Sequence, residues 1–239
     1  MSWTDGGYPA RARADHRPLA ERGRAASGRV LSARGNGTWW IIPVGIAACY
    51  ALFALAVHLR MLDAADLAIR DVYRPSDVWG PQQIRADRFV KWLQPTRLAV
   101  PLLLLVAGLS LLRRSLRPVV VLVVVGVPVA IATLGSKWVM AHLEGNPLPV
   151  AHGSFPSGHT VGVIVALGLA VLLVRPGTRW GWLLPAIVGG LMGWALVVAT
   201  VHPATDVVGA CLLAAAALGG ARASGLGQWA SDRPMRTAG

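Results

Sequence analysis

Charged residues are scarce in this sequence. Asp, Glu, Lys and Arg make up 14% of the 239 residues, whereas 54% are hydrophobic. An ordinary soluble domain carries about 25% charged residues, so the composition excludes that class and indicates a membrane protein. Cysteine is scarce as well, because Cys49 and Cys211 are the only two and both lie inside apolar runs. We therefore expect neither a structural disulfide nor a cysteine metal cluster.

Acidic residues are few among the charged ones: 11 Asp and Glu stand against 23 Lys and Arg, for a net charge of +12. Such an excess can indicate nucleic-acid binding, but most basic residues lie in short segments between apolar runs. That distribution is typical of a chain oriented in a bilayer, in contact with anionic headgroups. We predict membrane lipids and no nucleic acid as partners. The sequence also lacks a dinucleotide-binding motif, a P-loop, a metal-cluster motif and internal repeats.

Six apolar runs approach the ~20 residues that a helix needs to cross the bilayer core. The predicted spans are residues 39–59, 98–112, 119–140, 158–174, 180–200 and 206–221. Apolar residues at helical spacing over 62–72 predict an amphipathic interfacial helix, and 84–93 predicts a second short helix. The predicted fold is all-α: a polytopic six-transmembrane-helix bundle with an extracytoplasmic interfacial segment between spans one and two.

The two ends of the chain differ in composition from this bundle. Residues 1–37 contain seven arginines and no hydrophobic periodicity, which predicts a disordered basic tail. No small-residue cleavage site follows the first apolar run, so we expect an anchored span rather than a cleaved signal peptide. The membrane domain is predicted over 38–222, and residues 223–239 are predicted to form a second tail.

Charge between the runs predicts the orientation. The loops at 113–117 and 175–179 are basic, like both tails, whereas 60–97 is nearly balanced. By the positive-inside rule, both termini are then cytoplasmic in the cell membrane. The extracytoplasmic face carries the remaining loops and a set of polar residues from the ends of spans three to six: Lys137, Ser157, Gly158, His159, His202 and Asp206.

Ionisable residues near the ends of apolar runs are costly unless they are used or solvated. Local structural roles remain an alternative: Ser157 as a helix N-cap, Lys137 reaching toward headgroups, and His202 at a helix end. Because all of these residues are expected at one membrane face, we favour a shared functional site over separate structural roles.

The residue types in this set suit phosphoryl transfer. If the chain enters a helix at His202, Asp206 lies four residues on and can hold one imidazole nitrogen, leaving the other for in-line attack on phosphorus. His159 can protonate the leaving alkoxide. Lys137, Ser157 and the backbone amides of Gly158 and His159 can neutralise phosphoryl oxygens. Together these residues provide a nucleophile, an acid and phosphate-binding groups, which suffice for hydrolysis without a metal ion.

The same residues resemble a known family. Lys137, Pro156-Ser157-Gly158-His159 and His202-x-x-x-Asp206 are similar to three signature blocks of the type 2 phosphatidic acid phosphatase superfamily, which includes lipid phosphatases and vanadium-dependent haloperoxidases. The resemblance covers about residues 60–220. It implies a phosphohistidine at His202 partnered by Asp206, His159 as general acid, and phosphate binding at Ser157, Gly158 and Lys137. It also implies metal-independent action, without a cofactor, on a lipid phosphate or isoprenoid diphosphate. Neither the individual lipid nor the oligomeric state is predicted.

Two of the three signature blocks depart from the family pattern. Glu144 and Gly145 stand where the first block has Arg-Pro, and Leu196 stands where the third block has Arg. Loss of a phosphate-binding guanidinium costs on the order of 10³-fold in rate. The first hypothesis is a membrane lipid phosphate phosphatase, and the second is a catalytically impaired relative that binds a lipid or a protein. The basic residues that could replace the missing arginines at the phosphate are His142, His152, Arg85, Arg88 and Arg97.

Overall fold

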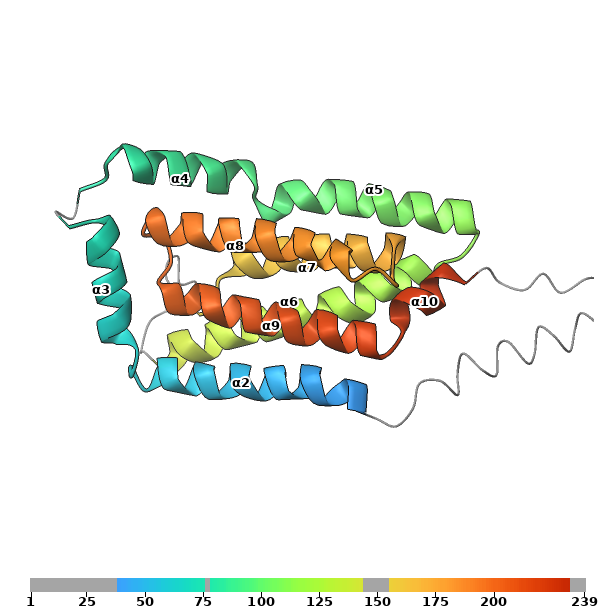
Figure 1. Cartoon of the computed structure of the whole chain (residues 1–239), viewed down its shortest axis with the longest axis horizontal. Helices are drawn as coiled ribbons and strands as arrows, with labels where there is room; N and C mark the ends of the chain where they lie inside the picture. The colour runs from blue at the N-terminus through green and yellow to red at the C-terminus, as the bar shows by residue number, and fades with distance from the viewer. Residues whose placement is uncertain (1–37, 76–77, 144–154, 233–239) are drawn as a thin grey trace, which may run out of the picture. The chain divides into compact units, whose positions relative to one another are not determined.

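The structure is a computed structural model that describes residues 38–75, 78–143 and 155–232. Regular structure in these residues is helical throughout (Figure 1). A short 3-10 turn at Thr38–Trp40 precedes the first long helix, and a second at Trp180–Trp182 precedes α8. The helices are α2 (Ile41–His58), α3 (Asp63–Tyr73), α4 (Pro81–Trp92), α5 (Pro95–Arg113), α6 (Arg117–Leu143), α7 (Gly158–Val174), α8 (Leu183–Val198), α9 (Ala204–Ala223) and α10 (Leu226–Ser231). The predicted basic tail at 1–37 lies outside the described residues.

Helix α7 is the centre of the bundle. It contacts α5, α6, α8, α9 and α10, and its side chains are buried on several faces, including Val163, Leu172 and Leu173. Glycines allow this close packing: a Cβ at Gly168 would lie 2.3 Å from Leu218 Cδ1 of α9. Small residues at such crossings let helix backbones approach closely in a membrane bundle.

Five stretches are long and apolar enough to cross a membrane. They are Thr38–His58, Pro81–Arg113, Arg117–His142, Trp180–Val198 and Ala204–Ala223. Helix α7 has 17 residues, or about 26 Å at 1.5 Å per residue, somewhat less than the ~30 Å hydrocarbon core. The prediction of an all-helical, multi-pass membrane protein is confirmed, while α7 as a sixth span stays a prediction.

Helices α3 and α4 connect α2 to α5. In Figure 1, α3 crosses the end of the bundle at which α8 ends and α9 begins, whereas α4 runs alongside α8. Both short helices were predicted from the sequence. The buried Gln83 of α4 accepts a hydrogen bond from the Gly80 amide at 2.9 Å, and its side-chain amide donates to the Tyr73 carbonyl oxygen. These bonds hold the end of α3 against the start of α4. The interfacial position of α3 stays a prediction.

The bundle extends past residue 222, where the sequence predicts its end. Gly225 adopts a left-handed backbone with φ of 75°, and the chain then turns into α10, which contacts α6, α7 and α9. Arg113 fixes this helix by donating hydrogen bonds to the carbonyl oxygens of Ala230 and Leu173, each at 3.0 Å. Six residues are too few for a periodic pattern, so the sequence did not predict α10.

Replacing Arg113 with alanine is expected to destabilise the bundle by about 2 kcal/mol, because hydrogen bonds from a charged donor contribute about 1.5–3 kcal/mol. The thermal unfolding midpoint of the purified protein in detergent measures this loss. Arg114→Ala is the matched control, since Arg114 is the exposed neighbour. Equal midpoints for the two variants would contradict the anchoring role of Arg113.

Candidate active site

Four helix ends meet at one end of the bundle. Helix α6 ends at Leu143 and α8 at Val198, while α7 begins at Gly158 and α9 at Ala204. Because these helices alternate in direction, their sequence-distant ends come together, as the topology predicts. The structure thereby gathers the predicted site residues at this end: Lys137, Ser157, Gly158, His159, His202 and Asp206.

His202 and Asp206 form a close pair. Nδ1 of His202 lies 2.8 Å from Oδ2 of Asp206, and their side chains are 9% and 3% exposed. The helix begins only at Ala204, so His202 lies in the preceding turn and Asp206 in the first helical turn. A carboxylate in the first turn is stabilised by the positive end of the helix dipole. With Nδ1 engaged, Nε2 is the ring nitrogen left to react.

His159 faces His202 from the start of α7. The two ring centroids are 6.4 Å apart and the ring planes are inclined by 63°. Reacting atoms in a near-attack arrangement are about 3–3.5 Å apart. Two imidazoles at this separation can therefore both reach one phosphoryl group, one as nucleophile and the other as acid.

Ser157 caps helix α7. Its Oγ accepts hydrogen bonds from the Thr160 amide at 3.4 Å and from Thr160 Oγ1 at 3.3 Å, and the residue is fully buried. The local role considered for Ser157 is therefore confirmed. The Ser157 amide also donates to the backbone oxygen of Asp206 at 3.0 Å. This bond ties the start of α7 to the start of α9, and a hydroxyl that accepts still has its own proton to donate.

Lys137 and Gly158 lie side by side. A Cβ at Gly158 would be 3.8 Å from Cε of Lys137, an ordinary contact, so the absence of a side chain leaves this backbone open to a ligand. Lys137 lies in the last two turns of α6, at the end of the bundle that carries His159 and Asp206. A cation here can attract a phosphoryl group toward the two histidines.

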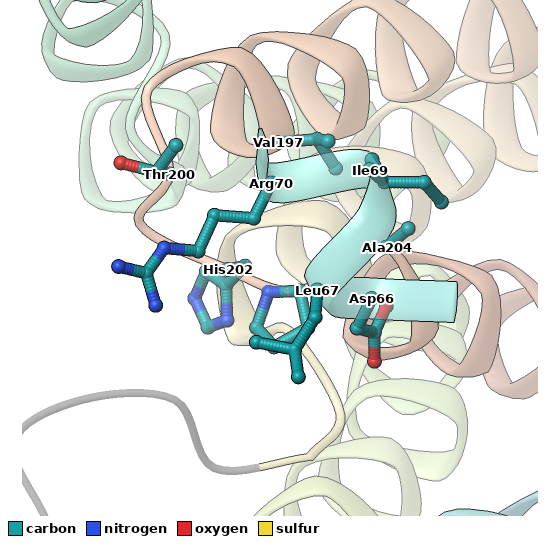
Figure 2. Close-up of a pocket in the computed structure, with 9 residues that line it drawn as sticks. Asp66, Leu67, Ile69, Arg70, Val197, Thr200, His202 and Ala204 are labelled. Atoms are coloured by element: carbon teal, nitrogen blue, oxygen red, sulfur yellow. The ribbon is translucent and has the colours of Figure 1, made fainter. Parts of the chain in front are cut away.

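A cavity of about 200 Å³ adjoins His202 (Figure 2). Its wall comes from α3 and from the turn between α8 and α9: Asp66, Leu67, Ile69, Arg70, Val197, Thr200, His202, Pro203 and Ala204. Sequence reasoning missed Asp66 and Arg70. A signal was available, because the two residues are four positions apart on the predicted interfacial helix and therefore share a face.

The cations that the sequence suggested as substitutes do not line this cavity. Arg85 lines a separate cavity with Tyr73 and Trp79, and the ring of His142 stacks on Trp138 at 5.3 Å. Glu144 and His152 lie outside the described residues. Leu196 is fully buried in an apolar cluster of α4, α7 and α8, so that family position contributes packing rather than charge.

Within the described ranges, no group of three or more His, Cys, Asp and Glu side chains forms a possible metal site.

Two comparisons with known proteins found similarity. Residues 125–224 match the family model of the PAP2 superfamily, a range that includes Lys137, the Ser157–His159 turn and the His202–Asp206 pair. The fold is similar to the crystal structure of the first transmembrane PAP2-type phosphatidylglycerolphosphate phosphatase from Bacillus subtilis. The TM-score is 0.60 at 20% identity, over 79% of this chain and 97% of that one.

No curated protein matched the sequence. At 20% identity the structural likeness shows the fold, whereas the family model adds the sequence pattern of the site region. The resemblance to the type 2 phosphatidic acid phosphatase superfamily is thus confirmed: residues 125–224 carry the PAP2 superfamily pattern, within a bundle that has the fold of a solved PAP2-type phosphatase.

Proposed function

We propose that this protein is a membrane phosphatase that hydrolyses a lipid phosphate or an isoprenoid diphosphate through a phosphohistidine. One observation carries the proposal: His202, held by Asp206 at 2.8 Å, faces the ring of His159 at 6.4 Å. A nucleophile, its orienting carboxylate and an acid are the groups that this reaction needs. The solved relative is itself named for a lipid phosphate substrate.

The reaction has two steps. Nε2 of His202 attacks phosphorus, the bond from phosphorus to the leaving oxygen breaks, and His159 gives that oxygen a proton. Neutral His159 then takes a proton from water, whose oxygen attacks phosphorus and breaks the bond to His202. Inorganic phosphate leaves, and His159 is protonated again for the next cycle. Lys137, Ser157 and the amides at Gly158 and His159 stabilise the phosphoryl oxygens in both steps.

The distribution of arginine supports an extracytoplasmic site. Among the described residues, the end of the bundle opposite His202 carries one acid, Asp232, and six arginines: Arg113, Arg114, Arg117, Arg175, Arg179 and Arg222. The basic residues of 60–97, nearer His202, are accompanied by four described aspartates, Asp63, Asp66, Asp71 and Asp87. Three of the six arginines lie over tryptophan rings, as Arg117 does over Trp229 at 5.2 Å. Lysine and arginine in short loops are typical of the cytoplasmic side, whereas tryptophan marks a membrane–water interface on either side. With α7 as the sixth span, both termini are then cytoplasmic, and α3 lies in the outer interface.

An apolar cavity supports a lipid as the substrate. It measures about 410 Å³, lies between α3, α8 and α9, and shares Ile69, Val197 and Ala204 with the His202 cavity. The exposed Trp194 and Val208 complete its membrane side. A cavity with charged side chains in its wall, next to an apolar cavity that shares part of that wall, suits an amphiphile, with the phosphate at His202 and the chain along α8 and α9.

The proposal is tested by phosphate release from the purified protein in detergent. The substrates are a panel of lipid monophosphates and isoprenoid diphosphates, with phosphatidylglycerolphosphate included. Release of inorganic phosphate from at least one of them is expected. No release from any of them by a folded protein would support the alternative of an impaired relative that binds a lipid or a protein.

Val208→Trp is expected to fill part of the apolar cavity. The kcat/KM for a long-chain lipid phosphate then falls about tenfold, in line with the loss of a few buried methylene contacts, while a short-chain, water-soluble phosphate keeps its rate. Steady-state kinetics on the two substrates measure the difference. Leu111→Trp, an exposed position near the opposite end of the bundle, is the matched control. Equal losses on both substrates would argue against a chain in this cavity.

A further inference from the structure

Helix α3 is fastened to the start of α9 by Asp66. The Thr205 amide donates to Oδ1 of Asp66 at 3.1 Å, and Thr205 Oγ1 donates to Oδ2 at 2.6 Å. Pro203 occupies the N-cap position of α9 and makes no side-chain cap. The first amides of a helix need an outside acceptor, and here a carboxylate from another helix supplies it. The capped residue directly precedes Asp206, the partner of His202.

A second contact fastens the other end of α3. Nη1 of Arg74 donates to Oγ1 of Thr200 at 3.4 Å, and Thr200 has a left-handed backbone with φ of 53°. Thr200 precedes His202 and Thr205 follows it, so the two contacts lie on either side of His202 in the sequence. Helix α3 thus has a defined position against the turn that carries His202.

Arg70 lies between these two contacts, one helical turn after Asp66. It belongs to the wall of the cavity next to His202, and it is the only Lys or Arg among the described residues that line this cavity. Figure 2 shows its side chain extending from α3 alongside the His202 ring. Arg70 is also exposed, so an anionic headgroup can reach it without opening the bundle.

We propose that Arg70 is a phosphate-binding residue of this site and supplies, from α3, a guanidinium to the phosphoryl oxygens of the substrate at His202. This inference rests on the proposed function and deepens it. A guanidinium binds phosphate through two parallel N–H donors, a geometry that a lysine ammonium does not offer. Asp66 is then a positioning residue, because it holds the helix that carries Arg70 against α9.

The variants Arg70→Ala and Arg70→Lys test the inference in the full-length protein. For Arg70→Ala, kcat/KM is expected to fall about 10²–10³-fold, the range found when a charge-stabilising group is removed from a phosphoryl-transfer site. Arg70→Lys is expected to regain part of this loss, since it keeps the charge but not the paired donors. Arg88→Ala, an exposed arginine of α4 outside the cavity wall, is expected to match the wild type.

A binding measurement distinguishes phosphate recognition from a structural role. Isothermal titration of inorganic phosphate, with orthovanadate as a second probe, is expected to give at least tenfold weaker binding for Arg70→Ala and unchanged binding for Arg88→Ala. Thermal unfolding in detergent checks that the variants are folded. If Arg70→Ala binds phosphate like the wild type, or if the wild type shows no phosphate binding, the assignment of Arg70 is wrong.

Failure of this inference is separable from failure of the proposed function. Phosphate binding that depends on Arg70, in a protein that hydrolyses no substrate, supports the site and overturns the catalytic function. Hydrolysis that requires His202 but is unaffected by Arg70→Ala supports the function and overturns the role of Arg70.

Discussion

Replacing His202 with alanine is expected to reduce phosphate release by about 10⁴-fold or more, because the variant lacks the atom that forms the covalent intermediate. Neither His159 nor His142 can take its position. His159 lies across the site with its ring centroid 6.4 Å away, and the ring of His142 stacks on Trp138. Asp206→Asn is expected to cost about 10²–10⁴-fold, since an amide holds the ring less well and favours the wrong tautomer.

Radiolabelled substrate measures the first step directly. The wild type, quenched during turnover, is expected to carry an acid-labile and base-stable phosphoryl group, and His202→Ala is expected to carry none. His58→Ala, at the end of α2, is the matched control and is expected to label like the wild type. Hydrolysis that survives His202→Ala would refute the phosphohistidine mechanism, whatever the substrate.

The arrangement of the long helices could be predicted from the sequence because each apolar run and its polar ends carry the information locally. The run at 158–174 became α7 with the predicted bounds, Gly158–Val174. Alternating direction then required that the start of α7 and the start of α9 share one end of the bundle. This was enough to bring His159 and His202 together across 43 positions, without any knowledge of side-chain packing.

The contribution of α3 could not be predicted in this way. Asp66 and Thr205 are 139 positions apart and meet only through tertiary packing. An amphipathic pattern predicts that a helix forms, but not which of its polar residues faces the site. The sequence therefore suggests Arg85, Arg88 and Arg97 as substitutes for the missing family arginines. In the structure, Arg70 is the arginine that lines the cavity beside His202.

Ser157 shows why a short motif is ambiguous when it is seen alone. Its side chain caps α7 through Thr160, as a purely structural serine would do. Its amide, however, is bonded to the backbone of Asp206, so the same residue also sets the position of the His–Asp pair relative to α7. The contact between the two helix starts thus gives Ser157 a second structural role beside the cap, while phosphate binding by its hydroxyl stays a prediction.

His159→Ala is expected to slow the hydrolysis of an alkyl phosphate by about 10²–10⁴-fold, the usual contribution of a positioned general acid. An alkoxide is a poor leaving group and needs the proton, whereas p-nitrophenolate leaves without one.

With p-nitrophenyl phosphate the His159→Ala variant is therefore expected to form the phosphohistidine at a nearly normal rate. It is then expected to stall, because no base activates the water. Stopped-flow absorbance should record a burst of nitrophenolate equal to the enzyme concentration, followed by slow turnover. His142→Ala is expected to behave like the wild type on both substrates. Absence of the burst, with equal losses on the two substrates, would show that His159 binds or positions the phosphate rather than transferring the proton.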